Sequence, residues 1–250
     1  MARAKFNVAA CTGCGIEFHP PIFGTTSDVC EECRKAVPQK LQAPAVSLEA
    51  APARRVNLTT VLVALNVMVF ALMVLGGVSP VQPSVRELLR WGGDYGPATF
   101  NHQWWRMITS AFVHAGILHL GLNMWVFSGL GRVAERLFGS WRMLALYLLS
   151  GIGSSLASLW WHPLAVSVGA SGAIFGVAGG LFVAMKLRHV ALPEQYLRRN
   201  IGSLGAFLIY NLLFGAAIAH VDNAAHVGGL LTGACIGALL PVKYLSESSQ

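Results

Sequence analysis

Charged side chains are scarce in this sequence. Asp, Glu, Lys and Arg make up 12% of its 250 residues, whereas soluble globular domains carry roughly 25%. Hydrophobic residues instead account for 54% of the chain. So little charge argues against a soluble protein, and the composition favours an integral membrane protein.

Acidic residues are the scarcer of the two charge types. The chain has 11 Asp and Glu against 18 Lys and Arg, which gives a net charge of +7. The basic excess lies in the N-terminal segment and in short segments between apolar runs, as in cytoplasmic loops of membrane proteins. We therefore expect no nucleic-acid partner. The polar first 55 residues also lack the pattern of a cleavable signal peptide.

Cysteine is rare, and four of the five cysteines lie before position 34 as two C-x2-C pairs that are fifteen residues apart. This spacing is typical of a four-cysteine zinc site. A bound metal can stabilise a segment too short for a hydrophobic core. Two disulfides are the alternative. We expect a zinc-ribbon-like cytoplasmic module over residues 1–36, with an unknown partner and one structural zinc ion held by Cys11, Cys14, Cys30 and Cys33.

The segment that follows is a predicted linker, because residues 37–55 are rich in Ala and Pro and lack an apolar period. Residues 79–110, rich in Trp, Pro and charge, are expected at the membrane interface. Basic segments alternate along the chain, which predicts six spans with both termini cytoplasmic, in the plasma (inner) membrane. The predicted spans are residues 56–78, 115–130, 143–161, 169–185, 201–219 and 224–240.

Two of these runs have, near their first residues, side chains that suit a nucleophile and its base. Ser171 lies in a Gly-Ala-Ser-Gly stretch, and His226 follows Ala225 at the start of the last run. A serine hydroxyl needs a neighbouring base to become a nucleophile, and histidine can provide one. Small residues repeat near both and would let the two helices approach closely. Ordinary packing, as in a transporter, is the alternative for these glycines, which are Gly172, Gly176, Gly179, Gly229, Gly233 and Gly237.

Further polar residues fall near the same membrane depth. His119 and Asn123 are four residues apart, so they share one helix face. Polar groups inside a membrane helix are costly and indicate function, although a helix–helix hydrogen bond is the alternative. They could stabilise an oxyanion together with the Ser171 backbone N–H at a helix start. Asp222 precedes His226 by four residues, and we interpret it as a turn residue, which leaves a dyad.

Together these motifs resemble the rhomboid family of intramembrane serine proteases. The resemblance extends over about residues 56–246 and includes Trp105-Arg106, His114, and Glu135 with Gly139. It implies an all-α fold, a six-transmembrane-helix rhomboid bundle, to which the small four-cysteine zinc ribbon is added.

The resemblance also implies a function. Ser171 would be the nucleophile, His226 the general base, and His119, Asn123 and the Ser171 N–H the oxyanion hole, with no cofactor for catalysis. Substrates would be transmembrane segments of other proteins in the lipid bilayer, cut near the outer face. Phe175 stands where some members stack a tyrosine on the histidine. A catalytically inactive rhomboid-like protein that binds membrane clients is the alternative.

Overall fold

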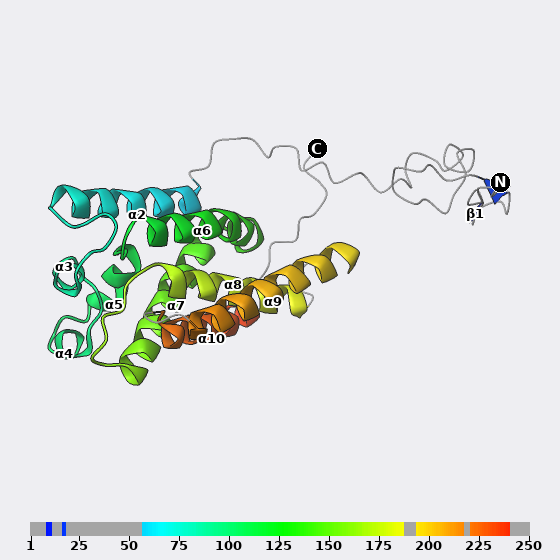
Figure 1. Cartoon of the computed structure of the whole chain (residues 1–250). Coiled ribbons are helices and arrows are strands. Elements are labelled where there is room, and N and C mark those ends of the chain that lie inside the picture. Colours follow the sequence, from blue (N-terminus) through cyan, green and yellow to red (C-terminus); the bar gives the residue numbers. More distant parts are fainter. Residues whose placement is uncertain (1–8, 12–16, 19–56, 188–193, 218–220, 241–250) are drawn as a thin grey trace. The chain divides into compact units, whose positions relative to one another are not determined.

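The chain divides into two compact units, Met1–Arg54 and Arg55–Gln250. A computed structural model (Figure 1) describes residues 9–11, 17–18, 57–187, 194–217 and 221–240.

In the first unit the described residues form one antiparallel pair of short strands, β1 (Ala9–Ala10) and β2 (Glu17–Phe18). Cys11 follows β1 directly and is buried, with 3% of its surface exposed. The other three predicted zinc ligands, like the predicted linker, lie outside the described residues. The zinc site therefore stays a prediction.

The described part of the second unit contains six helices of 16 to 24 residues, in the order of the six predicted runs. They are α2 (Leu58–Leu75), α6 (Ile117–Phe138), α7 (Ser140–Trp161), α8 (Ser171–Lys186), α9 (Glu194–Ala217) and α10 (Asn223–Leu239).

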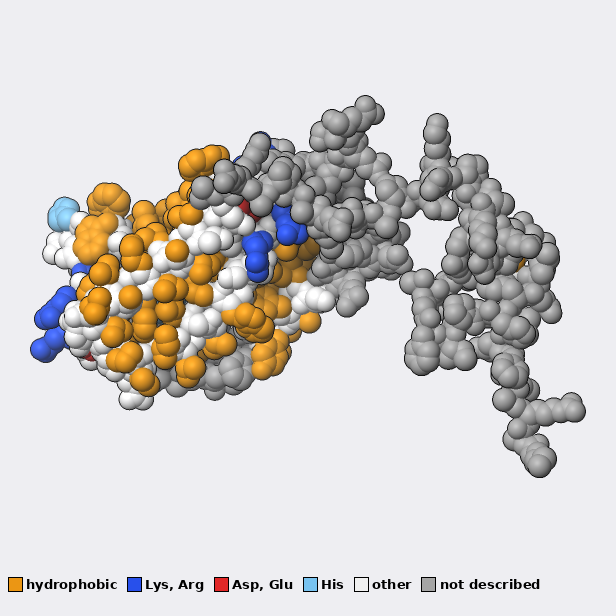
Figure 2. Space-filling view, turned by 90° about the horizontal axis from the view of Figure 1, so that it is seen from above, with side chains coloured by type: hydrophobic (Ala, Val, Ile, Leu, Met, Phe, Trp, Pro, Cys, Tyr) orange, Lys and Arg blue, Asp and Glu red, His pale blue; other side chains and the backbone are white. Residues whose placement is uncertain are grey.

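By length and composition, α2 and α7 can cross a membrane, and α6 is a third candidate if it is counted with the short helices before it, from which it is bent by 94°. Shorter apolar helices are α8, α10 and residues Ile201–Leu213 of α9. The number of spans stays a prediction. Hydrophobic side chains cover much of the face of this unit shown in Figure 2. Among all the described residues of this unit, several large hydrophobic side chains are more than 70% exposed, including Leu118, Trp125, Trp141 and Trp160, as expected for helices that face lipid.

The segment that links α2 to α6 is built from short helices. They are α3 (Val85–Arg90), α4 (Gly96–Thr99), α5 (Arg106–Thr109) and the 3-10 helix η2 (Ser110–Phe112). The Arg106 side chain holds this segment together, because its Nη1 donates to the carbonyl oxygens of Leu89 at 2.7 Å and Gly93 at 2.8 Å. Its guanidinium also lies 4.7 Å from the Trp105 ring centroid. Trp104 and Trp105 are 64% and 40% exposed, in keeping with the predicted interfacial position.

Two helices are longer than the sequence predicts. Helix α6 continues past residue 130 to Phe138, so the charged residues Arg132 and Arg136 form its last turns instead of a loop. Helix α9 likewise begins at Glu194, before the predicted start at residue 201. Arg and Glu are good helix formers, so charge ends an apolar run without ending the helix. Gly139 alone connects α6 to α7, with a φ of 87° that favours glycine.

The carboxylate of Glu135 on α6 fixes the start of α2. It accepts hydrogen bonds from the backbone N–H groups of Leu58 at 2.8 Å and Thr59 at 3.1 Å, and from the Thr59 hydroxyl at 2.7 Å. The first N–H groups of a helix have no partner within the helix. A negative charge at that end is also favourable for the helix dipole. Glu135 therefore joins α2 to α6 at their ends.

Helix α8 forms the centre of the second unit, because 12 of its 16 residues are buried. It lies against α7 and α10 (Figure 1). On α10, a methyl group added to any of three glycines would overlap with the backbone of α8. The facing pairs are Gly229 with Gly172, Gly233 with Gly176, and Gly237 with Gly180.

This contact confirms the predicted glycine stripes on α10 and α8 and adds one position on α8. Gly179 faces the α10 backbone at the carbonyl oxygen of Leu230, and the additional glycine, Gly180, faces Gly237. Backbones that touch in this way leave no space for a side chain between the two helices.

We expect Gly233→Ala to destabilise the protein, because its methyl group would overlap with the Gly176 backbone. Overpacking of this kind costs about 1–3 kcal/mol. The measurement is thermal unfolding in detergent, with Gly129→Ala on α6 as the control, since nothing lies within 4 Å of an added Cβ there. Equal unfolding midpoints for the two variants would contradict the close contact.

Candidate active site

Ser171 and His226 meet where α8 and α10 begin. The Nε2 of His226 lies 3.0 Å from the Oγ of Ser171, within hydrogen-bonding distance. Ser171 is the first residue of α8 and is half-buried, whereas His226 lies in the first turn of α10 and is 8% exposed. The structure thus brings together the two residues that the sequence nominates as nucleophile and base.

The backbone before Ser171 makes a tight turn into α8. Gly169 has a φ of 111°, a conformation that favours glycine. Its N–H donates to the Ser110 carbonyl at 2.9 Å. Ala170 caps α8 without a side-chain hydrogen bond. The N–H of Ser171 is therefore one of the helix-start donors that have no acceptor within the helix.

The imidazole of His119 lies against this turn. A Cβ added to Gly169 would lie 2.6 Å from the His119 Cε1, so the ring occupies the space beside that glycine. The His119 Nδ1 accepts from the Ala115 N–H at 3.4 Å. In a neutral ring this leaves the proton on Nε2, which can donate to a ligand.

Asn123 lies one turn further along α6 and is buried, with 7% of its surface exposed. Its Nδ2 donates to the His119 carbonyl oxygen at 2.9 Å. An amide nitrogen carries two hydrogens, so a second N–H remains available. His114 is fully buried and packs edge-on against His119, with ring centroids 5.2 Å apart.

Phe175 determines how the His226 ring is oriented. The two rings are stacked, with centroids 4.3 Å apart and an interplanar angle of 6°. Phe175 therefore stacks on the histidine at the position where some rhomboid family members have a tyrosine. The other ring nitrogen of His226, Nδ1, is buried and has no hydrogen-bond partner among the described residues.

Sequence analysis missed the partners of Asp222. It is the N-cap of α10, where its Oδ1 accepts from the Ala225 N–H at 2.9 Å. Its Oδ2 accepts from the hydroxyls of Ser158 at 2.5 Å and Ser167 at 2.7 Å. An aspartate just before an apolar run is a signal for the cap. Nothing in the sequence marks the two serines, which are 64 and 55 residues away.

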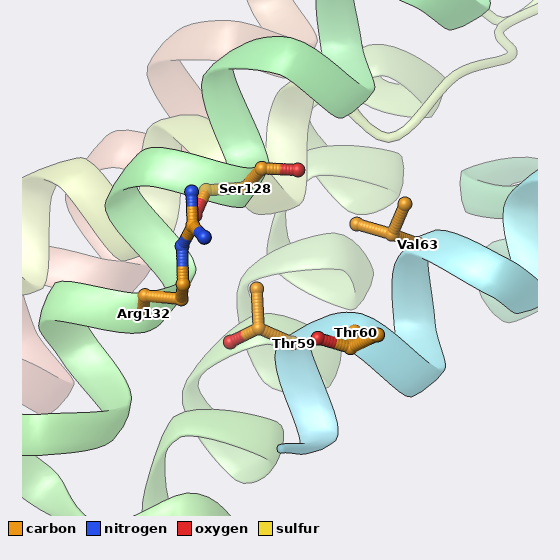
Figure 3. A pocket seen from close by; sticks show the side chains of 5 residues that line it. All are labelled: Thr59, Thr60, Val63, Ser128 and Arg132. Atoms are coloured by element: carbon orange, nitrogen blue, oxygen red, sulfur yellow. The ribbon is translucent and has the colours of Figure 1, made fainter. Parts of the chain in front are cut away.

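A separate shallow pocket lies between α2 and α6. Figure 3 shows its lining side chains, which are Thr59, Thr60, Val63, Ser128 and Arg132. None of them comes from α8 or α10, so this pocket is distinct from the meeting point of Ser171 and His226.

The fold and the site are those of a helical membrane protein in which a serine and a histidine meet where two packed helices begin. Residues 101–243, more than half of the chain, match the Rhomboid domain family. The chain belongs to the rhomboid family, which confirms the resemblance seen in the sequence, and it is an integral membrane protein.

Several characterised proteins are similar to it. The Rhomboid protease GluP of Bacillus subtilis is 36% identical over 184 residues, which cover 73% of this chain and 34% of GluP. Rhomboid-like protease 3 of Toxoplasma gondii is 38% identical over 159 residues, 62% of this chain and 59% of that protein. The Rhomboid protease AarA of Providencia stuartii is 29% identical over 214 residues, 76% and 73% of the two chains. The chain thus spans about a third of GluP and under two thirds of the Toxoplasma protein.

We expect Gly169→Ala to slow the reaction of Ser171 with a fluorophosphonate probe, because the added methyl would displace His119 and strain the turn. Loss of one oxyanion donor costs about 100-fold or more in rate. The measurement is the rate of covalent labelling in detergent. Gly121→Ala, which adds a methyl in open space on the same helix as His119, is the control. If both variants label at the wild-type rate, His119 has no role at this site.

Proposed function

We propose that this protein is an intramembrane serine endopeptidase in which Ser171 and His226 form a catalytic dyad. The observation that carries the proposal is the 3.0 Å contact between His226 Nε2 and Ser171 Oγ. Its membership of the rhomboid family, and the protease names of its relatives, support the same reaction.

In this mechanism His226 removes the proton from Ser171 as the hydroxyl oxygen attacks the scissile carbonyl carbon. The carbonyl oxygen becomes an oxyanion, and the amide nitrogen leaves with the proton that His226 returns. Water then attacks the acyl-enzyme with His226 again as the base, and this step releases the carboxylate product and restores Ser171.

The oxyanion would be stabilised by donors that are already in place. They are the Ser171 N–H at the start of α8, the Nε2–H of His119 and the second amide N–H of Asn123. The Asn123 bond to the His119 carbonyl supports this assignment, because it fixes the amide beside the histidine. Donors held rigidly by the fold need no reorganisation during the reaction.

The proposed substrates are transmembrane segments of other proteins, cut near the outer face of the plasma (inner) membrane. Support comes from the distribution of charge on α6 and α8. Both begin beside the active site, and both carry basic residues in their last turns, Arg136 and Lys186. Basic residues favour the cytoplasmic side. The site would then lie toward the outer side, with both termini in the cytoplasm.

The alternative of a catalytically inactive, client-binding protein is less favoured. Such a protein needs no activated nucleophile, whereas here the serine, the histidine and the ring that stacks on it are all in contact.

We expect detergent-purified protein to cleave a fluorescent transmembrane peptide, and Ser171→Ala or His226→Ala to lower kcat by at least about 1,000-fold. The reason is that each variant removes one half of the dyad. Ser128→Ala and His162→Ala, which alter a serine and a histidine away from the site, are the matched controls. Cleavage by Ser171→Ala at the wild-type rate would refute the proposal.

We further propose that the N-terminal cysteines bind one structural zinc ion, on the strength of their spacing and the buried Cys11 beside β1. Full-length protein purified under reducing conditions should contain one zinc per chain by elemental analysis. Cys30→Ser should lose it, because three thiolates remain. Cys235→Ser, which alters an exposed cysteine of α10, should retain it. Metal-free wild-type protein would refute this site.

A further inference from the structure

The carboxylate of Asp222 joins three parts of the fold near the proposed dyad. Its Oδ1 caps α10 through the Ala225 N–H at 2.9 Å. Its Oδ2 accepts from Ser158 near the end of α7 and from Ser167 in the segment that leads into α8. Ser158 is buried, and Asp222 and Ser167 are half-buried. All of these contacts are therefore shielded from most of the solvent.

Ser167 and Asp222 have the same separation in sequence from the two members of the proposed dyad. Ser167 precedes Ser171 by four residues, and Asp222 precedes His226 by four. Ser167 is also held from its other side, because its backbone exchanges two hydrogen bonds of 2.9 Å with Asp94. The His226 N–H donates to the Asp222 carbonyl at 3.2 Å. One hydrogen bond, from Ser167 to Asp222, thus links the two chain segments that carry nucleophile and base.

Asp222 is not the third member of a triad. Both of its oxygens are engaged by other donors. The Nδ1 of His226, which a triad carboxylate would contact, has no partner among the described residues. Asp222 can therefore act on the reaction without a hydrogen bond to the imidazole, through where it places His226.

We propose that Asp222 is a positioning residue that fixes the axial register of α10 against α8. This role rests on the proposed protease function. The glycine contacts bring the two backbones together, and the Ser167–Asp222 hydrogen bond adds a directional contact between the segments where the two helices begin. A slip of one residue would move His226 by about 1.5 Å. That displacement would break its 3.0 Å contact with Ser171.

The test compares Asp222→Ala, Asp222→Asn and Ser167→Ala in the full-length protein. Asn57→Ala, which removes the N-cap of α2, is the matched control for loss of a helix cap. The measurements are kcat and KM for a fluorescent transmembrane peptide, the rate at which a fluorophosphonate labels Ser171, and the unfolding temperature.

We expect Asp222→Ala to lower kcat and the labelling rate about 10- to 100-fold, since a displacement of about 1 Å can cost that much. KM should change little, because the substrate-binding surface is intact. Asp222→Asn should recover much of the activity, because its amide oxygen can still accept from Ala225 and its amide nitrogen can donate to the Ser167 hydroxyl oxygen. Ser167→Ala should act in the same direction and add little to Asp222→Ala, as expected of two residues that act through one contact.

Two results would overturn the proposal. One is an Asp222→Ala variant as active as Asn57→Ala. The other is full activity in Ser167→Ala together with equal loss in Asp222→Asn and Asp222→Ala, which would assign the effect to charge. If Asp222→Ala does not fold, Ser167→Ala decides. A wild-type protein that neither cleaves nor labels would refute the protease function itself, and this result is distinct from the other two.

Discussion

The backbone contact between α8 and α10 is the constraint on which the rest of the structure depends. Three pairs of facing glycines allow it, and a methyl group at any of the three glycines on α10 would force the helices apart. Ser171 and His226 stand at the first contact of this series, where both helices begin. Helices this close bring a side chain as short as serine within 3.0 Å of a histidine on the next helix.

Close packing fixes how far apart the helices lie, and carboxylates fix where they begin. Glu135 caps α2 from α6, and Asp222 caps its own helix while it binds α7. Unpaired N–H groups are costly in an apolar environment, where water cannot compensate them. Each carboxylate meets that need and also joins a second helix. Two of the 11 acidic residues of this chain thus stabilise contacts between helices.

Much of the site could be predicted from the sequence, because its signals are local. The glycine repeats, the polar residues on one face of α6 and the Ser and His at the start of apolar runs are all readable within one helix. The predicted lengths of α6 and α9 were too short, because charged residues mark the end of an apolar run and not the end of a helix. The hydrogen bonds of Asp222 were not predictable, since Ser158 and Ser167 become its neighbours only after α7, α8 and α10 have packed.

The position of Asp222 follows from the cost of charge in a membrane. In soluble serine proteases an aspartate beside the histidine orients the imidazole. In a membrane protein, an ionised carboxylate buried among apolar helices would have a high cost in free energy. Here the ring is oriented by stacking on Phe175. The carboxylate lies one turn away at the helix start, where an N–H and two hydroxyls satisfy it. In the proposed protease, the orientation that a triad obtains from a buried ion pair would be divided between an apolar ring and a helix cap.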